Sequence, residues 1–283
     1  MKSIIKGFWT SIKNRNLVYR LFAFYMFVYL SLYLMLNTGL SGLAKIAGMG
    51  DNLKNFNFTY LMLYLSKHGE IQPMLLSFVF FAFILYFFYS QFIVKSYLEN
   101  LSGAEKSWKN YRKVLLSWIY NIPLIIVTLV LLGKLYMKSR NTVTENPTTA
   151  SIIYYIFVAL IPILFIYLMA LLDSTRIITV KEKKSSFRAF LTSAALSLKK
   201  YPVFVLIYVF YGILALLIFY IYNLITQFLG AKLWGQVLIL MFFHFLYFMF
   251  QLFVKFSIMG SEFALIDSHY KKTEEEEIKS EEE

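Results

Sequence analysis

Asp173 and Arg176 are the charged pair most able to do chemistry in this sequence, because they directly follow a long uncharged apolar stretch. Three residues apart, they lie on one face of a helix, where opposite charges attract. We expect a boundary ion pair that ends a membrane span and anchors the segment after it. The alternatives are a buried latch with a surface helix and a site where Arg176 binds a lipid phosphate.

Lys199, Lys200 and His244 are the other candidates for polar or headgroup contacts. The two lysines immediately precede an apolar stretch, where cations meet anionic lipid headgroups. His244 lies near the middle of the last apolar stretch, where a neutral imidazole needs a partner on another helix. We interpret His244 as a structural hydrogen-bonding residue, with a proton or substrate role as the alternative.

Catalytic and cofactor motifs are missing from the sequence. There is no Cys, which excludes disulfides, cysteine zinc sites, iron–sulfur clusters and thiol catalysis. The three histidines are scattered, and no phosphate-binding loop, dinucleotide fingerprint or nucleophile elbow is found. Glu262, Asp267 and His269 form only a weak metal candidate, since no matching ligands occur elsewhere. We therefore expect no enzyme activity, no metal and no cofactor.

Composition places these residues in a membrane protein. The chain is 59% hydrophobic and 16% charged, whereas a soluble domain is about 25% charged. A helix needs about 20 mostly apolar residues to cross a bilayer. Six stretches without Asp, Glu, Lys or Arg meet this requirement and predict an all-α protein with six transmembrane helices. They are residues 21–40, 71–94, 114–132, 151–172, 202–225 and 233–254, within a membrane domain of residues 1–270.

The distribution of basic residues predicts the orientation. Of the 28 Lys and Arg, 21 lie in the amino-terminal segment, in 95–113, in 176–200 and in the segment from Lys255, and these alternate with six crossings. Positive charge stays on the cytoplasmic side, so both termini should be cytoplasmic. Residues 271–283 are rich in Glu and are expected to be an acidic disordered tail.

The cytoplasmic segments carry apolar residues at helical spacing. We expect basic amphipathic helices that lie in the membrane interface, with cytoplasmic extensions of the spans packed on one another as the alternative. A third, weaker stripe predicts one more such helix near residues 101–111. The three stripes are Ile5, Phe8, Trp9 and Ile12; Phe187, Phe190, Leu191, Ala194 and Leu198; and Leu101, Ala104, Trp108 and Tyr111.

Short similarities suggest an internal repeat. Residues 7–11 (GFWTS) resemble 189–193 (AFLTS), and residues 91–95 (QFIVK) resemble 251–255 (QLFVK). The repeated unit is a surface helix, a span, an outer loop and a second span, and three copies would build the chain. Chance similarity in so biased a composition is the alternative.

The second half of the chain has a recognisable order of segments. Asp173-Ser-Thr-Arg176 ends a span, and residues 180–184 and 187–202 follow it. This pattern, in the second half of the chain, resembles uncharacterised bacterial six-span membrane proteins similar to the membrane domain fused to glycerophosphodiester phosphodiesterases. The resemblance implies a multi-pass protein of the bacterial cytoplasmic (inner) membrane with surface helices. It does not imply phosphodiesterase activity, because the catalytic domain is missing from this sequence.

These observations favour a non-catalytic function. We expect an integral membrane scaffold, or an accessory subunit of a larger membrane complex, that organises lipids with anionic headgroups and contacts a protein partner or a second copy of itself. The alternative is a small-molecule or lipid transporter with a polar cavity at the midplane near His244, Asn121 and Asn223. An intramembrane enzyme comes third, because no set of acidic, histidine or serine side chains is evident for it.

Overall fold

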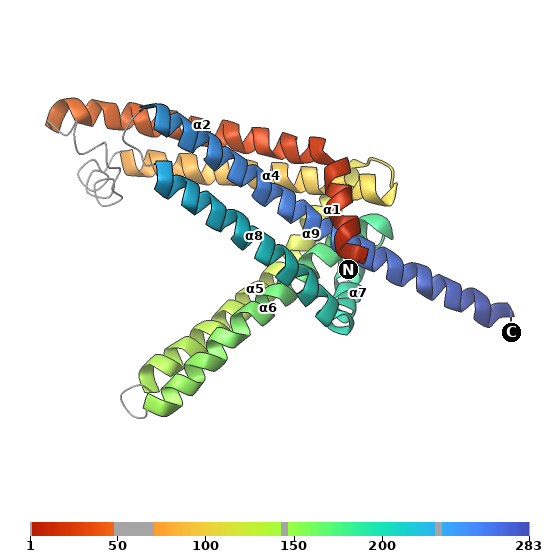
Figure 1. Cartoon of the computed structure of the whole chain (residues 1–283). Coiled ribbons are helices and arrows are strands. Elements are labelled where there is room, and N and C mark those ends of the chain that lie inside the picture. Colours follow the sequence, from red (N-terminus) through yellow and green to blue (C-terminus); the bar gives the residue numbers. More distant parts are fainter. Residues whose placement is uncertain (1, 48–70, 143–146, 230–233, 283) are drawn as a thin grey trace. The chain divides into compact units, whose positions relative to one another are not determined.

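The structure is a computed structural model that describes the backbone of residues 2–47, 71–142, 147–229 and 234–282 (Figure 1). Side chains are described for residues 2–31, 77–142, 147–228 and 239–271. Within these ranges the chain is helical apart from short turns, and it forms no strand. The helices are α1 (Lys2–Lys13), α2 (Arg15–Ala47), α4 (Ile71–Ser102), α5 (Trp108–Thr142), α6 (Pro147–Lys181), α7 (Ser186–Lys199), α8 (Tyr201–Leu229) and α9 (Trp234–Glu282).

Five described helices are long and apolar enough to cross a membrane, which confirms the expected all-α membrane class. The first expected span falls in α2, but the side chains of residues 32–40 are outside the described part, so a crossing there stays a prediction. The five candidates are Ser77–Ser102, Trp108–Thr142, Pro147–Lys181, Tyr201–Phe228 and Ile239–Lys271.

The chain divides into two compact units, Tyr19–Ile93 and a larger unit of Met1–Val18 with Val94–Glu283. In the smaller unit, aromatic rings join α2 to α4. Phe24 stacks on Tyr89 with ring centroids 4.3 Å apart, and Tyr25 meets Tyr86 edge to face at 6.4 Å. Such aromatic pairs add to the packing energy beyond the area that they bury.

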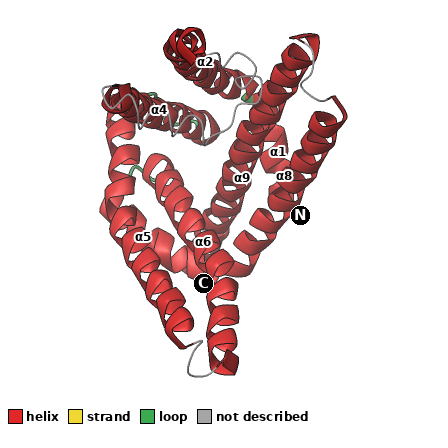
Figure 2. Ribbon diagram, turned by 90° about the vertical axis from the view of Figure 1, so that its left-hand side faces the viewer, coloured by secondary structure: helices red, strands yellow, loops and turns green. Residues whose placement is uncertain are grey.

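Two antiparallel helix pairs make up most of the larger unit. Helices α5 and α6 lie side by side along their length, and α8 packs against α9 (Figures 1 and 2). The halves of these helices that lead to the connections 143–146 and 230–233 expose large apolar side chains, such as Ile126, Leu129, Tyr155 and Leu216. Hydrocarbon is a suitable solvent for such a surface, whereas water is not.

The core of the larger unit lies where α6 and α9 continue beyond their expected spans. Every residue from Ala170 to Val180 is buried, and so are most residues from 252 to 266. The basic linker expected from Arg176 is therefore wrong at its beginning, because α6 runs on to Lys181. Two of its hydroxyl side chains bond within the helix, since Thr175 donates to the Leu171 carbonyl and Thr179 to the Thr175 carbonyl, whereas the buried Ser174 hydroxyl has no hydrogen-bond partner among the described residues.

Helix α1 turns part of its apolar stripe away from the protein. Ile4, Gly7 and Ser11 are buried, and the helix packs on α9. Ile5 and Trp9, from the expected stripe, are 57% and 64% exposed. Ile4, Gly7 and Ser11 thus make the protein contact, and Phe8 meets Phe253 of α9 edge to face. Ile5 and Trp9 are left for another environment.

Helix α7 repeats this arrangement on α6. Ser185 caps its first turn, and Ala189 and Ser193 are among its buried residues. Phe187 and Leu191 are each 52% exposed. Ala189 and Ser193 hold the same places in the sequence repeat as Gly7 and Ser11, so the two helices bury equivalent positions.

The third expected amphipathic helix, over residues 101–111, is wrong. Helix α4 ends at Ser102, a turn follows, and α5 begins at Trp108. Gly103 has φ +67°, a left-handed conformation that a glycine adopts without strain. Residues 101 and 104 therefore do not share a helical face with Trp108 and Tyr111.

The end of the chain also differs from the expectation. Helix α9 continues to Glu282, through the segment expected to be a disordered acidic tail. Glu and Lys are good helix formers, and Lys271 pairs with Asp267 one turn earlier at 3.2 Å. A helix that already spans the protein extends more easily than one that must begin anew.

Candidate functional site

The ion pair of Asp173 and Arg176 lies in the core of the larger unit. An Nη atom of Arg176 is 2.7 Å from an Oδ of Asp173, and the two residues are only 3% and 8% exposed. The guanidinium also lies over the Trp118 ring of α5, 4.9 Å from its centroid, a favourable cation–π position. The pair is thus a buried contact between α6 and its neighbours, not a pair at an exposed boundary.

Glu262 of α9 is a further acidic residue in this buried cluster. It is completely buried, and it is close enough to Asp173 and Arg176 to interact with them electrostatically. Neither carboxylate oxygen accepts a hydrogen bond of good geometry, although the Tyr208 hydroxyl of α8 is within reach. Four helices, α5, α6, α8 and α9, therefore contribute to one group of charged and polar side chains.

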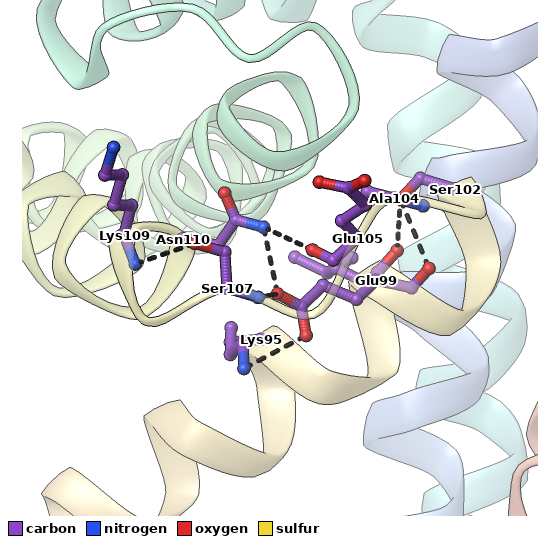
Figure 3. Close-up of polar contacts among 9 residues, drawn as sticks. Lys95, Glu99, Ser102, Ala104, Glu105, Ser107, Lys109 and Asn110 are labelled. Carbon is purple, nitrogen blue, oxygen red and sulfur yellow. Dashed lines mark hydrogen bonds and ion pairs between the residues drawn. The ribbon is translucent and has the colours of Figure 1, made fainter.

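A second group of buried charges organises the turn between α4 and α5 (Figure 3). The ammonium of Lys95 is 3.0 Å from an oxygen of Glu99, and both residues are buried. The other oxygen of Glu99 accepts from the Ser107 backbone N–H at 3.0 Å and from the Asn110 amide at 2.9 Å. A carboxylate in this position caps the beginning of α5 and interacts favourably with the helix dipole.

Two tyrosine hydroxyls hold α1 in place. Tyr97 of α4 donates to the Phe256 carbonyl and is 3.2 Å from the Ser11 hydroxyl. Tyr211 of α8 donates to the Ile4 carbonyl at 3.0 Å. Between these points α1 crosses α9 so closely that a Cβ on Gly7 would lie 2.6 Å from the Ser257 carbonyl oxygen. The crossing requires the absence of a side chain.

The remaining predicted residues lie apart from these groups. His244 of α9 is 3.3 Å from the Tyr222 hydroxyl of α8, as a structural role for this imidazole requires. Asn121 donates to the Ser117 carbonyl of its own helix at 2.7 Å. Lys199 is exposed in the last turn of α7, and the Lys200 N–H caps that helix through the Leu196 carbonyl.

Two cavities in the larger unit have basic linings. The first, of about 370 Å³, is bounded by α1, α6, α9 and the end of α4. The second, of about 280 Å³, lies between α7 and α9 and includes Lys184 and Lys199. The first is lined by Lys6, Thr10, Leu101, Ser102, Lys181, Gly260, Phe263, Ala264, Asp267 and Lys271.

The weak metal trio is separated in the structure. Glu262 belongs to the buried cluster, Asp267 pairs with Lys181 at 3.1 Å, and His269 lines the second cavity. Among the described residues, no three His, Asp or Glu side chains are grouped to hold a metal ion.

Comparison with protein-family models, with curated proteins and with solved structures gave no match.

Proposed function

We propose that this protein is a non-catalytic integral membrane scaffold, or an accessory subunit of a larger membrane complex, that organises anionic lipids at its basic end. The observation that carries the proposal is the outward direction of the apolar stripes on α1 and α7. Ile5, Trp9, Phe187 and Leu191 are all more than half exposed, although their helices are packed on the protein.

The membrane interface is the environment that suits these two faces. A short helix with a broad apolar stripe and flanking lysines buries the stripe among lipid chains and leaves the cations at the headgroups. Lys2, Lys6 and Lys13 flank the stripe of α1, and Lys199 and Lys200 end α7. The alternative, in which the stripes pack on cytoplasmic extensions of the spans, would bury the same side chains in protein.

The topology in this proposal has six crossings and two cytoplasmic termini. Helix α2 supplies the first crossing, and the five described candidates supply the others. The 21 basic residues on one side set the orientation, and a bacterial cytoplasmic (inner) membrane supplies the anionic lipids. The resemblance to six-span bacterial membrane proteins supports the same topology.

The proposal also includes the threefold repeat of surface helix, span, outer loop and span. Helix α1, which begins the first repeat, packs on α9, which ends the third; helix α7, which begins the third, packs on α6, which ends the second. Each surface helix therefore contacts the last helix of a preceding repeat. In the second repeat the turn capped by Glu99 takes the place of the surface helix.

The scaffold proposal has better support than a transporter. His244 and Asn121 make local hydrogen bonds, and neither lines either of the two cavities described above. A transporter would need these side chains in a polar cavity at the midplane.

Purification in mild detergent from the native membrane tests the proposal. We expect lipid to remain bound in native mass spectra, together with a protein partner or a second copy of the chain. Replacement of Trp9 and Leu191 by Ser should remove most of this lipid while thermal unfolding changes little, since neither side chain is buried. Monomer with no partner and no retained lipid would contradict the proposal.

Ala189→Phe serves as the matched control on the opposite face of α7. Ala189 is completely buried, so a phenyl ring there should lower the unfolding temperature. If the two exposed replacements destabilise the protein as much as this one, the stripes pack on protein and the interfacial assignment fails.

A further inference from the structure

We propose that the cavity between α1, α6 and α9 binds the phosphate group of an anionic phospholipid, with the lipid chains beside the apolar face of α1. This inference rests on the proposed function, because it names one of the lipid sites through which a scaffold would act.

The charges around the cavity favour an anion. Lys6, Lys181 and Lys271 come from three different helices, and Asp267 is the one carboxylate in the lining. Asp267 pairs with Lys181 at 3.1 Å and with Lys271 at 3.2 Å, which holds both ammonium groups at the cavity. Glu182 lies outside the lining but 3.9 Å from Lys181, so three ammonium groups face two carboxylates and one positive charge is in excess. A phosphate diester supplies one negative charge and oxygen acceptors for these donors.

The rest of the lining suits an amphiphile better than a free ion. Leu101, Phe263 and Ala264 form an apolar part of the wall, beside the Thr10 and Ser102 hydroxyls. A volume of about 370 Å³ also exceeds what a phosphate ion alone requires and leaves room for a headgroup.

The position of α1 supplies the argument for a lipid. Lys6 and Thr10 line the cavity, while Ile5 and Trp9 of the same helix are exposed on its apolar stripe. A phospholipid with its phosphate at Lys6 can lay its chains along that stripe, and so it uses both features at once. Free phosphate would use only the first of them.

The second cavity repeats the arrangement at α7. Thr192 lines it together with Lys184 and Lys199. Thr192 has the same place in AFLTS as Thr10 in GFWTS. The two surface helices therefore present the same repeat position to a basic cavity, which is expected if each unit carries a headgroup site.

Lipid binding to the detergent-purified full chain tests the inference. Phosphatidylglycerol, phosphatidylcholine and inorganic phosphate are titrated separately, with binding measured by native mass spectrometry. The variant is Lys6→Gln with Lys271→Gln. Its control is Lys106→Gln with Lys109→Gln, which removes the same charge from two exposed lysines outside the cavity and outside the two surface helices.

We expect phosphatidylglycerol to bind more tightly than phosphatidylcholine, and inorganic phosphate to compete only weakly. A surface lysine contributes about fivefold to the binding of an anionic lipid, so the cavity variant should weaken phosphatidylglycerol binding by about 25-fold. The control variant should change it less than about twofold, because a charge distant from the site acts only through a screened field.

Three results would overturn the inference: equal losses in the two variants, equal affinity for the two lipids, or full displacement of lipid by inorganic phosphate at the same concentration. Loss of lipid in the Trp9 and Leu191 variant without loss in the Lys6 and Lys271 variant would reject this cavity and leave the scaffold proposal standing. Retention of lipid in both variants would reject the cavity site and the scaffold proposal together.

Discussion

At the scale of single residues, the buried cluster of Asp173, Arg176 and Glu262 depends on which carboxylate compensates the charge of the guanidinium. Two carboxylates interact with the Arg176 guanidinium, and all three residues are less than 10% exposed. The Lys255 ammonium of α9 also interacts electrostatically with Asp173 and Arg176. An uncompensated charge in such a place costs several kcal/mol. Asp173 makes the 2.7 Å contact with Arg176, whereas Glu262 interacts with Arg176 only at longer range, so Asp173 is the carboxylate on which the guanidinium mainly depends.

Glu262→Gln and Asp173→Asn should therefore have very different effects. The first keeps the shape of the side chain and removes a carboxyl group that makes no close contact with Arg176, so stability should change by less than about 1 kcal/mol. The second leaves Arg176 buried without its partner and should cost about 3 kcal/mol. Unfolding by denaturant in detergent micelles measures both. Equal losses would mean that Glu262 is an ion-pair partner of Arg176 in its own right.

Sequence patterns predicted this site only in part. The spacing of Asp173 and Arg176 indicates their pairing, and the structure forms the pair. No local pattern reveals that Glu262, almost ninety residues later, lies beside them, because the packing of α6 on α9 brings them together. The capping role of Glu99 was missed for the same reason, since its partners follow a turn that periodicity does not resolve.

At the scale of elements, hydropathy locates spans but not the ends of helices. The expected span 151–172 ends before the charged Asp173 and Arg176, whereas the helix continues through Ser174 and Thr175 to Lys181. In the structure these polar groups are buried by neighbours distant in sequence. Helical periodicity likewise identifies the stripes of α1 and α7 but not the face that meets the protein. Small residues such as Gly7 and Ala189 make that contact, and they contribute little to an amphipathic pattern.

The crossing of α1 and α9 gives a sharp test at this scale. A Cβ on Gly7 would collide with the backbone of α9 at Ser257 and Ser261, so Gly7→Ala should separate the helices at a cost of about 1–3 kcal/mol. Gly212→Ala is the matched control, because nothing lies within 4 Å of its added Cβ. Thermal unfolding and tryptic cleavage at Lys6 and Lys13 measure the difference. Equal behaviour of the two variants would show that α1 is not held at this crossing.

At the scale of the whole molecule, the distribution of basic residues and the burial of charged residues at helix ends favour the same orientation. The helix ends that carry Lys95, Asp173 and Arg176 are the ends that the charge rule assigns to the cytoplasm. Buried charges are more easily accommodated near an aqueous boundary than at the bilayer centre. The proposed orientation therefore places the costly groups, the basic cavities and the two surface helices on one side of the membrane.

Single cysteines can test that orientation without background labelling, because the natural chain has none. With a membrane-impermeant maleimide on right-side-out spheroplasts, Thr148→Cys should react at once and Lys106→Cys only after permeabilisation, since α5 crosses between them. Lys13→Cys should likewise be protected and Asp51→Cys labelled if α2 supplies the first crossing. Labelling of both members of the second pair from outside would remove that crossing. Reversal of both pairs would invert the protein and place the lysine-lined cavities at the outer leaflet, where the proposed lipid sites would face a surface with less anionic lipid.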